Sequence, residues 1–547
     1  MAVTSVLGNI ADIHHGEIFP GEIFIEDGRI VRIEKRPGPF DDFLIPGFVD
    51  AHIHVESSML APAEFARAAS VHGTVATVSD PHEIANVLGV EGVDYMIEES
   101  RDAAVKIFYG ASPCVPATDF ESSGATLGVE EVARLLDRPE ICFLSEVMNF
   151  PGVLAGDPSL LAKIAAARER GLPVDGHAPQ LRGAQAGAYA AAGISTDHEC
   201  TSLEEAQDKI AAGMKILIRE GSAARNYAAL EPLLFTHPDR CMFCSDDLHP
   251  DSLIEGHINL LVRRAVAAGV PPLTALRVAS LNPVEHYGLP VGLLRVGDPA
   301  DFLMVGDLRE FAVRQTWLNG CLVAENGVSQ TPRREPRLVN RFAAEEIVLE
   351  TLKIPCTTAT ARVEVIRVED GQLVTGRETV EMVSVDGELP SDPERDFLKL
   401  VVVNRYQPSA PPGLAFIRNF GIRHGAIASS VAHDSHNLIA VGADDASLGR
   451  ALNLLIKSQG GVCAVTGDTE RLVPLPIAGL MAGGEAHEVA AHYGSVEELA
   501  RELGSPLRAP LMTLSFMALL VIPELKLSDR GLFDGAAFRF TPLIVSS

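Results

Sequence analysis

The sequence lacks the features that mark secreted, membrane-spanning and nucleic-acid-binding proteins. The stretch MAVTSVLGNIADIHHGEIF at its start has neither the basic residues nor the apolar core of a signal peptide. The most apolar run, residues 511–522, is shorter than the roughly 20 residues of a membrane-spanning helix, so we expect a buried helix there. Lys and Arg number 45 against 73 Asp and Glu, and the net charge of −28 argues against nucleic acid or an anionic membrane as a partner.

Cysteine is also sparse. The eight cysteines follow no framework of spacings, which is typical of a reducing compartment, and we expect a cytoplasmic protein. Cys241 and Cys244 form a lone CxxC motif, which predicts two core thiols rather than a zinc ribbon because no second pair lies nearby. What the chain does have is length, with 547 residues, and 47% hydrophobic residues, enough for a globular protein of several structural units.

The middle of the chain alternates short apolar runs with helical stretches such as residues 157–171. The runs lie at 45–49, 73–80, 103–110, 140–146, 171–177, 193–199, 215–220 and 240–247. Repeated βα units indicate a parallel sheet, and a count of eight runs indicates a (β/α)8 barrel of the α/β class.

Strand-like segments flank this region on both sides. Residues 20–34 alternate apolar and polar side chains around Asp27 and Gly28, which predicts a β-hairpin, and a similar texture returns at 297–307 and 316–327. Further strand-like runs occur after about residue 350, in ARVEVIRVEDGQLVTG and FLKLVVVNRY. The basic stretch 329–345 lies between the two regions, and we expect it to be a linker.

Potential metal ligands follow the predicted barrel strands. His52 and His54 come at the first strand, where alternate side chains point to the same side. The later candidates are Glu146 at the fourth strand, His177 at the fifth, His198 at the sixth, and Asp246 and Asp247 at the eighth. One histidine at a strand end is more often structural, but this whole set at the C-terminal rim of a barrel predicts an active site. Imidazole and carboxylate ligands suit Fe²⁺, Mn²⁺ or Zn²⁺, and the set is large enough for two ions that share a water.

Four segments, in this order, resemble the bacterial adenine deaminases of the amidohydrolase superfamily: PGFVDAHIHVESSM, SDPHEIANVLG, SEVMNFPGV and CSDDLHP. The HxH motif after the first strand is the signature of the superfamily. The resemblance implies a catalytic barrel at 45–290, a small discontinuous β-sandwich formed by 1–44 plus 291–345, and an additional C-terminal α+β domain at 346–547. It also implies hydrolysis of adenine to hypoxanthine and ammonia for purine salvage, in a homo-oligomer that we expect to be a dimer.

The family pattern assigns the metal ligands. It implies two divalent ions, Mn²⁺ or Fe²⁺ with Zn²⁺ as a further option, held by His52, His54, Glu146, His177, His198 and Asp246. Many binuclear relatives bridge their metals with a carboxylated lysine after the fourth strand. The segment ICFLSEVMNF has no lysine, so Glu146 is the expected bridge.

Proton transfer is assigned to three residues near these ligands. Asp246 is the expected general base and then general acid, and His82 is a second proton carrier, unless it is a loop histidine bonded to the backbone. Asp247 is expected either to orient His82 or to face solvent, and which aspartate of the pair binds metal is taken from the family pattern.

Substrate binding is assigned to Glu56, Ser57 and Glu83. Relatives that hydrolyse carboxylate-bearing cyclic amides, such as dihydroorotases, carry an arginine where this chain has Glu56. A carboxylate can instead accept a hydrogen bond from a purine N–H. The alternative for Glu56 is to orient a metal-bound histidine from behind.

The region 421–437 contains His424, His433, Asp434 and His436. Because their spacing fits no metal motif, we expect a structural role or a lid over the barrel rather than a second metal site. Two other functions stay open at this point: a cyclic amide hydrolase of the same superfamily, which Glu56 and the missing lysine oppose, and a non-catalytic scaffold, which the intact ligand set opposes.

Overall fold

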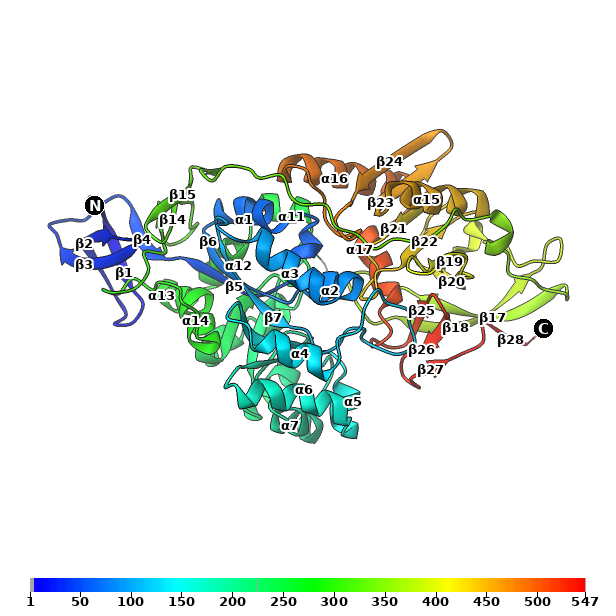
Figure 1. Ribbon diagram of the computed structural model, residues 1–547, viewed down its shortest axis with the longest axis horizontal. Coiled ribbons are helices and arrows are strands. Elements are labelled where there is room, and N and C mark those ends of the chain that lie inside the picture. Colours follow the sequence, from blue (N-terminus) through cyan, green and yellow to red (C-terminus); the bar gives the residue numbers. More distant parts are fainter. Residues whose placement is uncertain (1–3, 223, 547) are drawn as a thin grey trace.

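The computed structural model describes residues 4–222 and 224–546. Figure 1 shows an elongated molecule in which a small sheet, a central α/β unit and a C-terminal sheet follow one another along the long axis. Within the described residues, no helix has the length and apolar character needed to cross a membrane.

The central unit is the α/β barrel that the sequence predicts. One parallel sheet contains β5 (Phe48–Ile53), β6 (Thr74–Ser79), β7 (Lys106–Ala111), β8 (Ile141–Val147) and β9 (Val174–Gly176), and a second contains β10 (Thr196–Asp197), β11 (Lys215–Arg219) and β12 (Cys241–Cys244). A parallel bridge between Ile53 and Asp246 joins β5 to the end of β12. On the other side, the Ser195 amide donates to the Val174 carbonyl at 2.8 Å, so the two sheets curve into one barrel.

Helices surround these strands. They are α1 (Pro62–Ser70), α2 (His82–Leu88), α3 (Val90–Glu99), α4 (Val129–Leu136), α5 (Phe150–Ala155), α6 (Pro158–Glu169), α7 (Gly183–Ala191), α8 (Leu203–Ala211), α9 (Tyr227–Leu230), α10 (Leu233–Thr236), α11 (Pro250–Glu255), α12 (Ile258–Ala267), α13 (Pro272–Leu276) and α14 (Asn282–Tyr287). The helix predicted at 157–171 is α6, which begins with an Asp157 cap that accepts the Leu160 amide at 2.9 Å. Cys241 and Cys244 are buried in β12, as predicted.

The first predicted strand, 45–49, is wrong in its boundaries. Its residues are divided between β4 (Phe43–Pro46), which belongs to the small sheet, and β5 of the barrel. The break falls at Gly47, where an added Cβ would lie 2.3 Å from Val75 atoms of β6. The chain changes sheets where only glycine fits against the neighbouring strand.

The small sheet is formed by strands that precede the barrel and strands that follow it. Its eight strands run in the order β16-β15-β14-β13-β4-β1-β2-β3. Their bounds are β1 (Thr4–Asp12), β2 (Glu17–Glu26), β3 (Arg29–Lys35), β13 (Phe302–Val305), β14 (Val313–Leu318), β15 (Cys321–Glu325) and β16 (Val328–Ser329). The predicted hairpin is β2–β3, and its turn residues Asp27 and Gly28 have positive φ values of 50° and 76°.

The C-terminal region contains a nine-stranded sheet and a three-stranded one. The larger sheet contains β17 (Thr360–Arg367), β18 (Gly376–Val383), β19 (Leu398–Val403), β20 (Gly413–Arg418), β21 (Ala426–Ser429), β22 (Leu438–Gly442), β23 (Gly461–Thr466), β24 (Thr469–Pro474) and β28 (Ile544–Ser546). The smaller contains β25 (Leu525–Ser528), β26 (Gly531–Asp534) and β27 (Arg539–Phe540), and the longest helices are α15 (Asp445–Ser458) and α16 (Ala486–Glu502). Residues 330–348 before it have no helix or strand, which fits the predicted linker.

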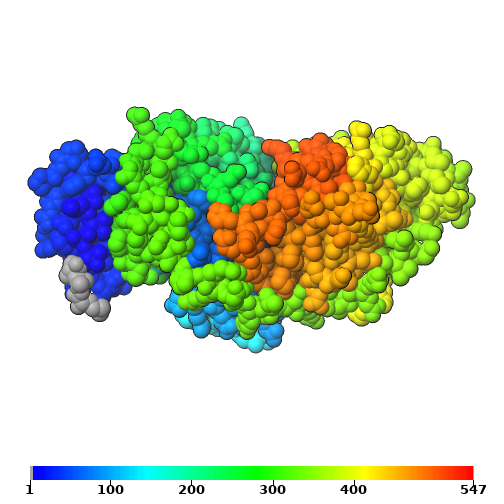
Figure 2. Space-filling model, turned by 90° about the horizontal axis from the view of Figure 1, so that it is seen from above, coloured from blue at the N-terminus to red at the C-terminus, as the bar shows by residue number. Residues whose placement is uncertain are grey.

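The C-terminal region packs on the barrel, and Figure 2 shows its orange residues against the green and blue surface. The contact is polar as well as apolar. The Ser435 hydroxyl donates to Glu121 at 2.8 Å, and the Asn437 amide donates to the Ser122 carbonyl at 2.8 Å. The run 511–522 is buried, as expected, but it is not one helix: α17 (Pro510–Ser515) ends early and a short 3-10 turn follows.

Candidate active site

The six predicted metal ligands come together at the C-terminal ends of the barrel strands. His52 lies inside β5 and His54 directly after it, Glu146 is in β8, and His177, His198 and Asp246 follow β9, β10 and β12. All six are buried, and their ligand atoms fall into overlapping groups that could hold metal ions. The strand ends of one barrel therefore converge as the sequence predicts.

Glu146 stands between two pairs of histidines. Its Oε1 lies 2.9 Å from Nε2 of His54 and 3.6 Å from Nε2 of His52. Its Oε2 lies 2.7 Å from Nδ1 of His177 and 3.3 Å from Nε2 of His198. Burial alone would raise the pKa of Glu146, but His198 and His177 lower it well below its usual range. The carboxylate is thus ionised, with one oxygen for each pair.

Asp246 is held by the backbone of the first barrel strand. Its amide donates to the His52 carbonyl at 2.9 Å, and its carbonyl accepts the His54 amide at 3.3 Å. Its φ of 56° is unusual for a residue with a side chain. Its Oδ1 lies 3.2 Å from Nε2 of His54, and its other oxygen pairs with the buried guanidinium of Arg219.

The donor set fits divalent cations. Nε2 of His52, His177 and His198 is buried without a hydrogen-bond partner among the described residues. Nδ1 of His54 is 3.0 Å from the Asp80 carbonyl, which leaves its Nε2 free to face Glu146 and Asp246. Unpartnered nitrogens beside ionised carboxylates, without thiolate, form a cluster that could hold a divalent cation.

His82 lies beside these ligands, with carboxylates on both sides of its ring. Its Nδ1 is 3.1 Å from Oδ2 of Asp80, and its Nε2 is 3.6 Å from Oδ1 of Asp434 in the C-terminal region. The carboxylates that contact the His82 ring are thus those of Asp80 and Asp434, and the role expected of Asp247 stays a prediction. Asp247 lines the same cavity, and its Oδ1 accepts the Ser57 hydroxyl at 2.5 Å.

The three predicted substrate residues form a group of their own. Ser57 Oγ lies 3.1 Å from Oε1 of Glu83, and Oε1 of Glu56 accepts the Ile84 amide at 3.3 Å. Burial and the neighbouring Glu83 raise the pKa of Glu56 to about 8. These side chains lie behind Asp247 and His433, which themselves line the cavity over the metal ligands.

That cavity has a volume of about 20 Å³, which is room for about one water. Its floor is made by barrel residues, among them His54, Glu146, His177 and Asp246. Its roof comes from the C-terminal region: Leu373, His433, Asp434, Phe516 and Leu519. The lid interpretation of 421–437 fits His433 and Asp434, whereas His424 is exposed and outside the cavity.

Sequence reasoning missed three residues around the ligands. Asp80 accepts the Ser112 hydroxyl at 2.6 Å besides contacting His82. Glu199 lies 3.4 Å from Nε2 of His198, and Arg219 joins Glu199 to Asp246. Their position in the sequence could have identified them, because each lies at or close to the end of a predicted barrel strand.

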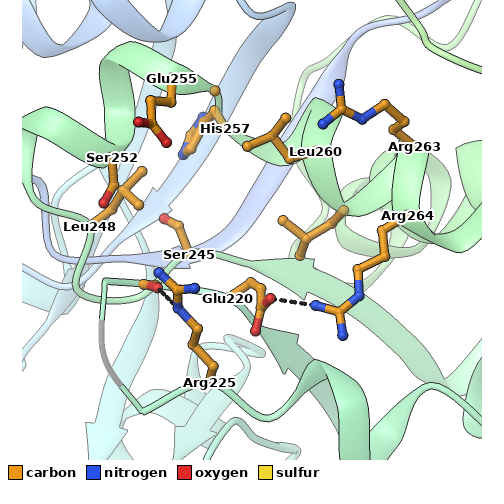
Figure 3. A pocket seen from close by; sticks show the side chains of 13 residues that line it. Glu220, Arg225, Ser245, Leu248, Ser252, Glu255, His257, Leu260, Arg263 and Arg264 are labelled. Carbon is orange, nitrogen blue, oxygen red and sulfur yellow. Dashed lines mark hydrogen bonds and ion pairs between the residues drawn. The ribbon is translucent and has the colours of Figure 1, made fainter. Parts of the chain in front are cut away.

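A second cavity, of about 400 Å³, lies where β11 and β12 meet α11 and α12 (Figure 3). Two of its arginines already have partners: Arg264 contacts Glu220 at 2.5 Å, and Arg225 donates to the Gly221 carbonyl at 2.8 Å. The described residues that line it include none of the six candidate ligands. The smaller cavity, which the candidate ligands line, is therefore the candidate reaction site.

Known protein families account for most of the chain. The profile of the amidohydrolase family matches residues 43–323, and that of the adenine deaminase C-terminal domain matches residues 372–539. Solved structures are more distant: N-acetyl-D-glucosamine-6-phosphate deacetylase from Mycobacterium smegmatis has 18% identity and a TM-score of 0.44, covering 59% of this chain and 100% of its own.

Curated relatives are similar over nearly their whole length. Adenine deaminase of Salinibacter ruber is 54% identical, covering 99% of this chain and 99% of its own. That of Sulfurovum sp. is 52% identical over 97% and 98%, and that of Methanosarcina mazei is 49% identical over 98% and 99%. Both family profiles match the chain, and the relatives named adenine deaminase are similar to it over nearly its full length. The protein therefore belongs to the adenine deaminases of the amidohydrolase family.

Proposed function

We propose that this adenine deaminase hydrolyses adenine to hypoxanthine and ammonia at a centre of two divalent metal ions. The ions would be held by His52, His54, Glu146, His177, His198 and Asp246, with Mn²⁺ or Fe²⁺ preferred and Zn²⁺ as a further option. The observation that carries the proposal is Glu146, whose two oxygens face different histidine pairs. When bound, the ions supply an activated water at neutral pH.

The remaining work belongs to side chains of the protein. Asp246 takes the proton of the attacking water, because its carboxylate lies among the ligands and is kept ionised by Arg219. It returns that proton to the departing amino group. His82, held between Asp80 and Asp434, carries the second proton to the ring.

Glu56, Ser57 and Glu83 support the purine-binding side of the site. Ser57 contacts Asp247 and Glu83 contacts His433, and both of these partners line the cavity, while Glu56 lies beside Glu83. The cavity holds only about one water, so it is too small for adenine in this conformation. Adenine therefore binds to a conformation in which the roof residues of the C-terminal region lie farther from the barrel.

We also propose the three units expected from the sequence: 1–44 plus 291–345, 45–290 and 346–547. The eight-stranded sheet, whose strands come from before and after the barrel, supports the first unit. Because β4 belongs to this sheet and ends at Pro46, the boundary expected at residue 44 lies two residues later. The homodimer is also a proposal, which light scattering on the purified protein would test.

The test of the function is a direct assay. Purified protein loaded with Mn²⁺ should convert adenine to hypoxanthine, with one ammonia released for each base consumed. Relatives named as adenine deaminases do not favour the cyclic amide hydrolase. Loaded protein that leaves adenine intact but opens dihydroorotate would reverse that choice.

A further inference from the structure

Asp434 is an aspartate of the C-terminal region that reaches into the catalytic cavity. It is 2% exposed and lines the same space as His54, Glu146 and Asp246 of the barrel. Its Oδ1 lies 3.6 Å from Nε2 of His82 and 3.7 Å from Nδ1 of His433. Its Oδ2 is buried and has no hydrogen-bond partner in residues 4–222 and 224–546.

The carboxylate of Asp434 is ionised despite its burial. Burial raises its pKa, but His433 and His82 lower it below its usual range. His433 itself is cationic: burial lowers its pKa, whereas Glu83 and Asp247 raise it to about 9. A buried ionised carboxylate with an unused oxygen is costly unless a donor reaches it. Because Asp434 lines the cavity, a bound substrate can supply that donor.

The neighbouring histidines do not offer Asp434 a metal instead. Glu83, His433 and His436 have ligand atoms close enough to hold an ion. However, Nδ1 of His436 accepts the Ala432 amide at 3.3 Å, so Nε2 of the neutral ring carries the proton. A protonated Nε2 cannot bind a cation. His436 therefore opposes a second metal site in the segment 421–437.

Adenine has two kinds of N–H donor. Its amino group must face the attacking water at the metal ligands, because that is where the C–N bond breaks. The other donor is the N–H of the imidazole ring, which a nucleoside lacks because the sugar occupies a ring nitrogen. A carboxylate facing the ligands from the roof can accept that second N–H.

We propose that Asp434 is a specificity-determining residue that accepts a hydrogen bond from the imidazole-ring N–H of adenine. The C-terminal region thereby reads the feature that separates the free base from its nucleosides. A site built around a substrate N–H discriminates strongly against analogues without it, because its own polar group is then left unpaired. The proposal rests on adenine as the substrate, and goes beyond it by naming the selecting residue.

Matched ligands isolate this one hydrogen bond. 7-Deazaadenine keeps the N9–H, and its furan analogue has oxygen in place of that N–H. 9-Deazaadenine keeps the N7–H, and its furan analogue again replaces it with oxygen. Inhibition constants against adenine deamination are measured for both pairs in the wild-type enzyme. In at least one pair we expect the N–H compound to bind on the order of 10–100-fold more tightly.

The same ratios are then measured in Asp434→Leu, which has no acceptor, and in Asp434→Asn, which keeps a neutral one. We expect the ratio to fall to about 1–3 in the leucine variant and to an intermediate value in the asparagine variant. Asp468→Leu, at an exposed position between β23 and β24, is the matched control and should keep the wild-type ratio.

Unchanged ratios in both Asp434 variants would overturn the proposal. If the leucine variant does not fold, the asparagine variant decides alone. The experiment also distinguishes failure of this inference from failure of the proposed function. A wild-type enzyme that deaminates adenine but binds both members of each pair equally refutes only the role of Asp434. A loaded wild-type enzyme that does not act on adenine refutes the function itself.

Discussion

Oε1 of Glu146 lies 2.9 Å from Nε2 of His54, and Oε2 of the same carboxylate points to a different part of the barrel. There Oε2 meets His177 at 2.7 Å. One side chain from β8 therefore spans ligands that come from opposite sides of the strand order. A bridging carboxylate must have this arrangement, and it is the basis of the first prediction.

Glu146→Gln should lose metal. An amide cannot share a negative charge between two cations, so elemental analysis is expected to give clearly fewer than two ions per chain. Glu169→Gln, at an exposed position of α6, is the control and should keep its metal. Full occupancy in the Glu146 variant would remove the bridging role.

His82→Asn should keep its metal while kcat falls by about 10²–10⁴-fold, the usual contribution of a general acid–base group. Nδ1 of His82 is 3.6 Å from Glu146, close enough that a ligand role must be tested as well. Metal analysis separates the two: a variant that loses metal makes His82 a ligand, and an unchanged kcat makes it structural.

Arg219→Met should destabilise the enzyme by about 3–5 kcal/mol, because it leaves Glu199 and Asp246 without their buried cation. Thermal unfolding of the metal-free protein measures this. Arg170→Met, an exposed pair with Asp137, should change stability by less than about 1 kcal/mol. Equal stability of both variants would mean that the ion pair contributes nothing.

Glu121→Gln should change how stability depends on pH. Burial and Asp434 raise the pKa of Glu121 from 4.5 to about 8, so the folded protein holds a proton that the unfolded chain releases. The stability from this proton is complete below about pH 4.5 and is lost as the pH rises through about 8. Relative to wild type, the variant should therefore gain roughly 2–4 kcal/mol between pH 5 and pH 9. A constant difference in melting temperature across that range would contradict the assignment.

Much of the barrel and the convergence of its candidate ligands could be predicted because both depend on local pattern. Each of His177, His198 and Glu146 lies at the end of an apolar run, and parallel strands bring their ends to one rim. The exact start of β5 could not be predicted, since residues 45–49 are apolar throughout and the change of sheet depends on the fit of Gly47 against Val75.

Contacts between distant parts of the chain were beyond the sequence. Asp434 is far along the chain from His82, and only the packing of the C-terminal region brings them within 3.6 Å. Likewise, the run 511–522 is apolar except for Thr513 and Ser515, so its pattern does not show that α17 ends at Ser515.

The central claim is a two-metal centre that deaminates adenine. Its most direct test is to titrate metal-free enzyme with Mn²⁺ while following adenine deamination by ammonia release. We expect negligible activity without metal and a plateau at about two ions per chain, with Glu146→Gln far below that plateau. A plateau at one ion per chain, or full activity in metal-free enzyme, would contradict the account.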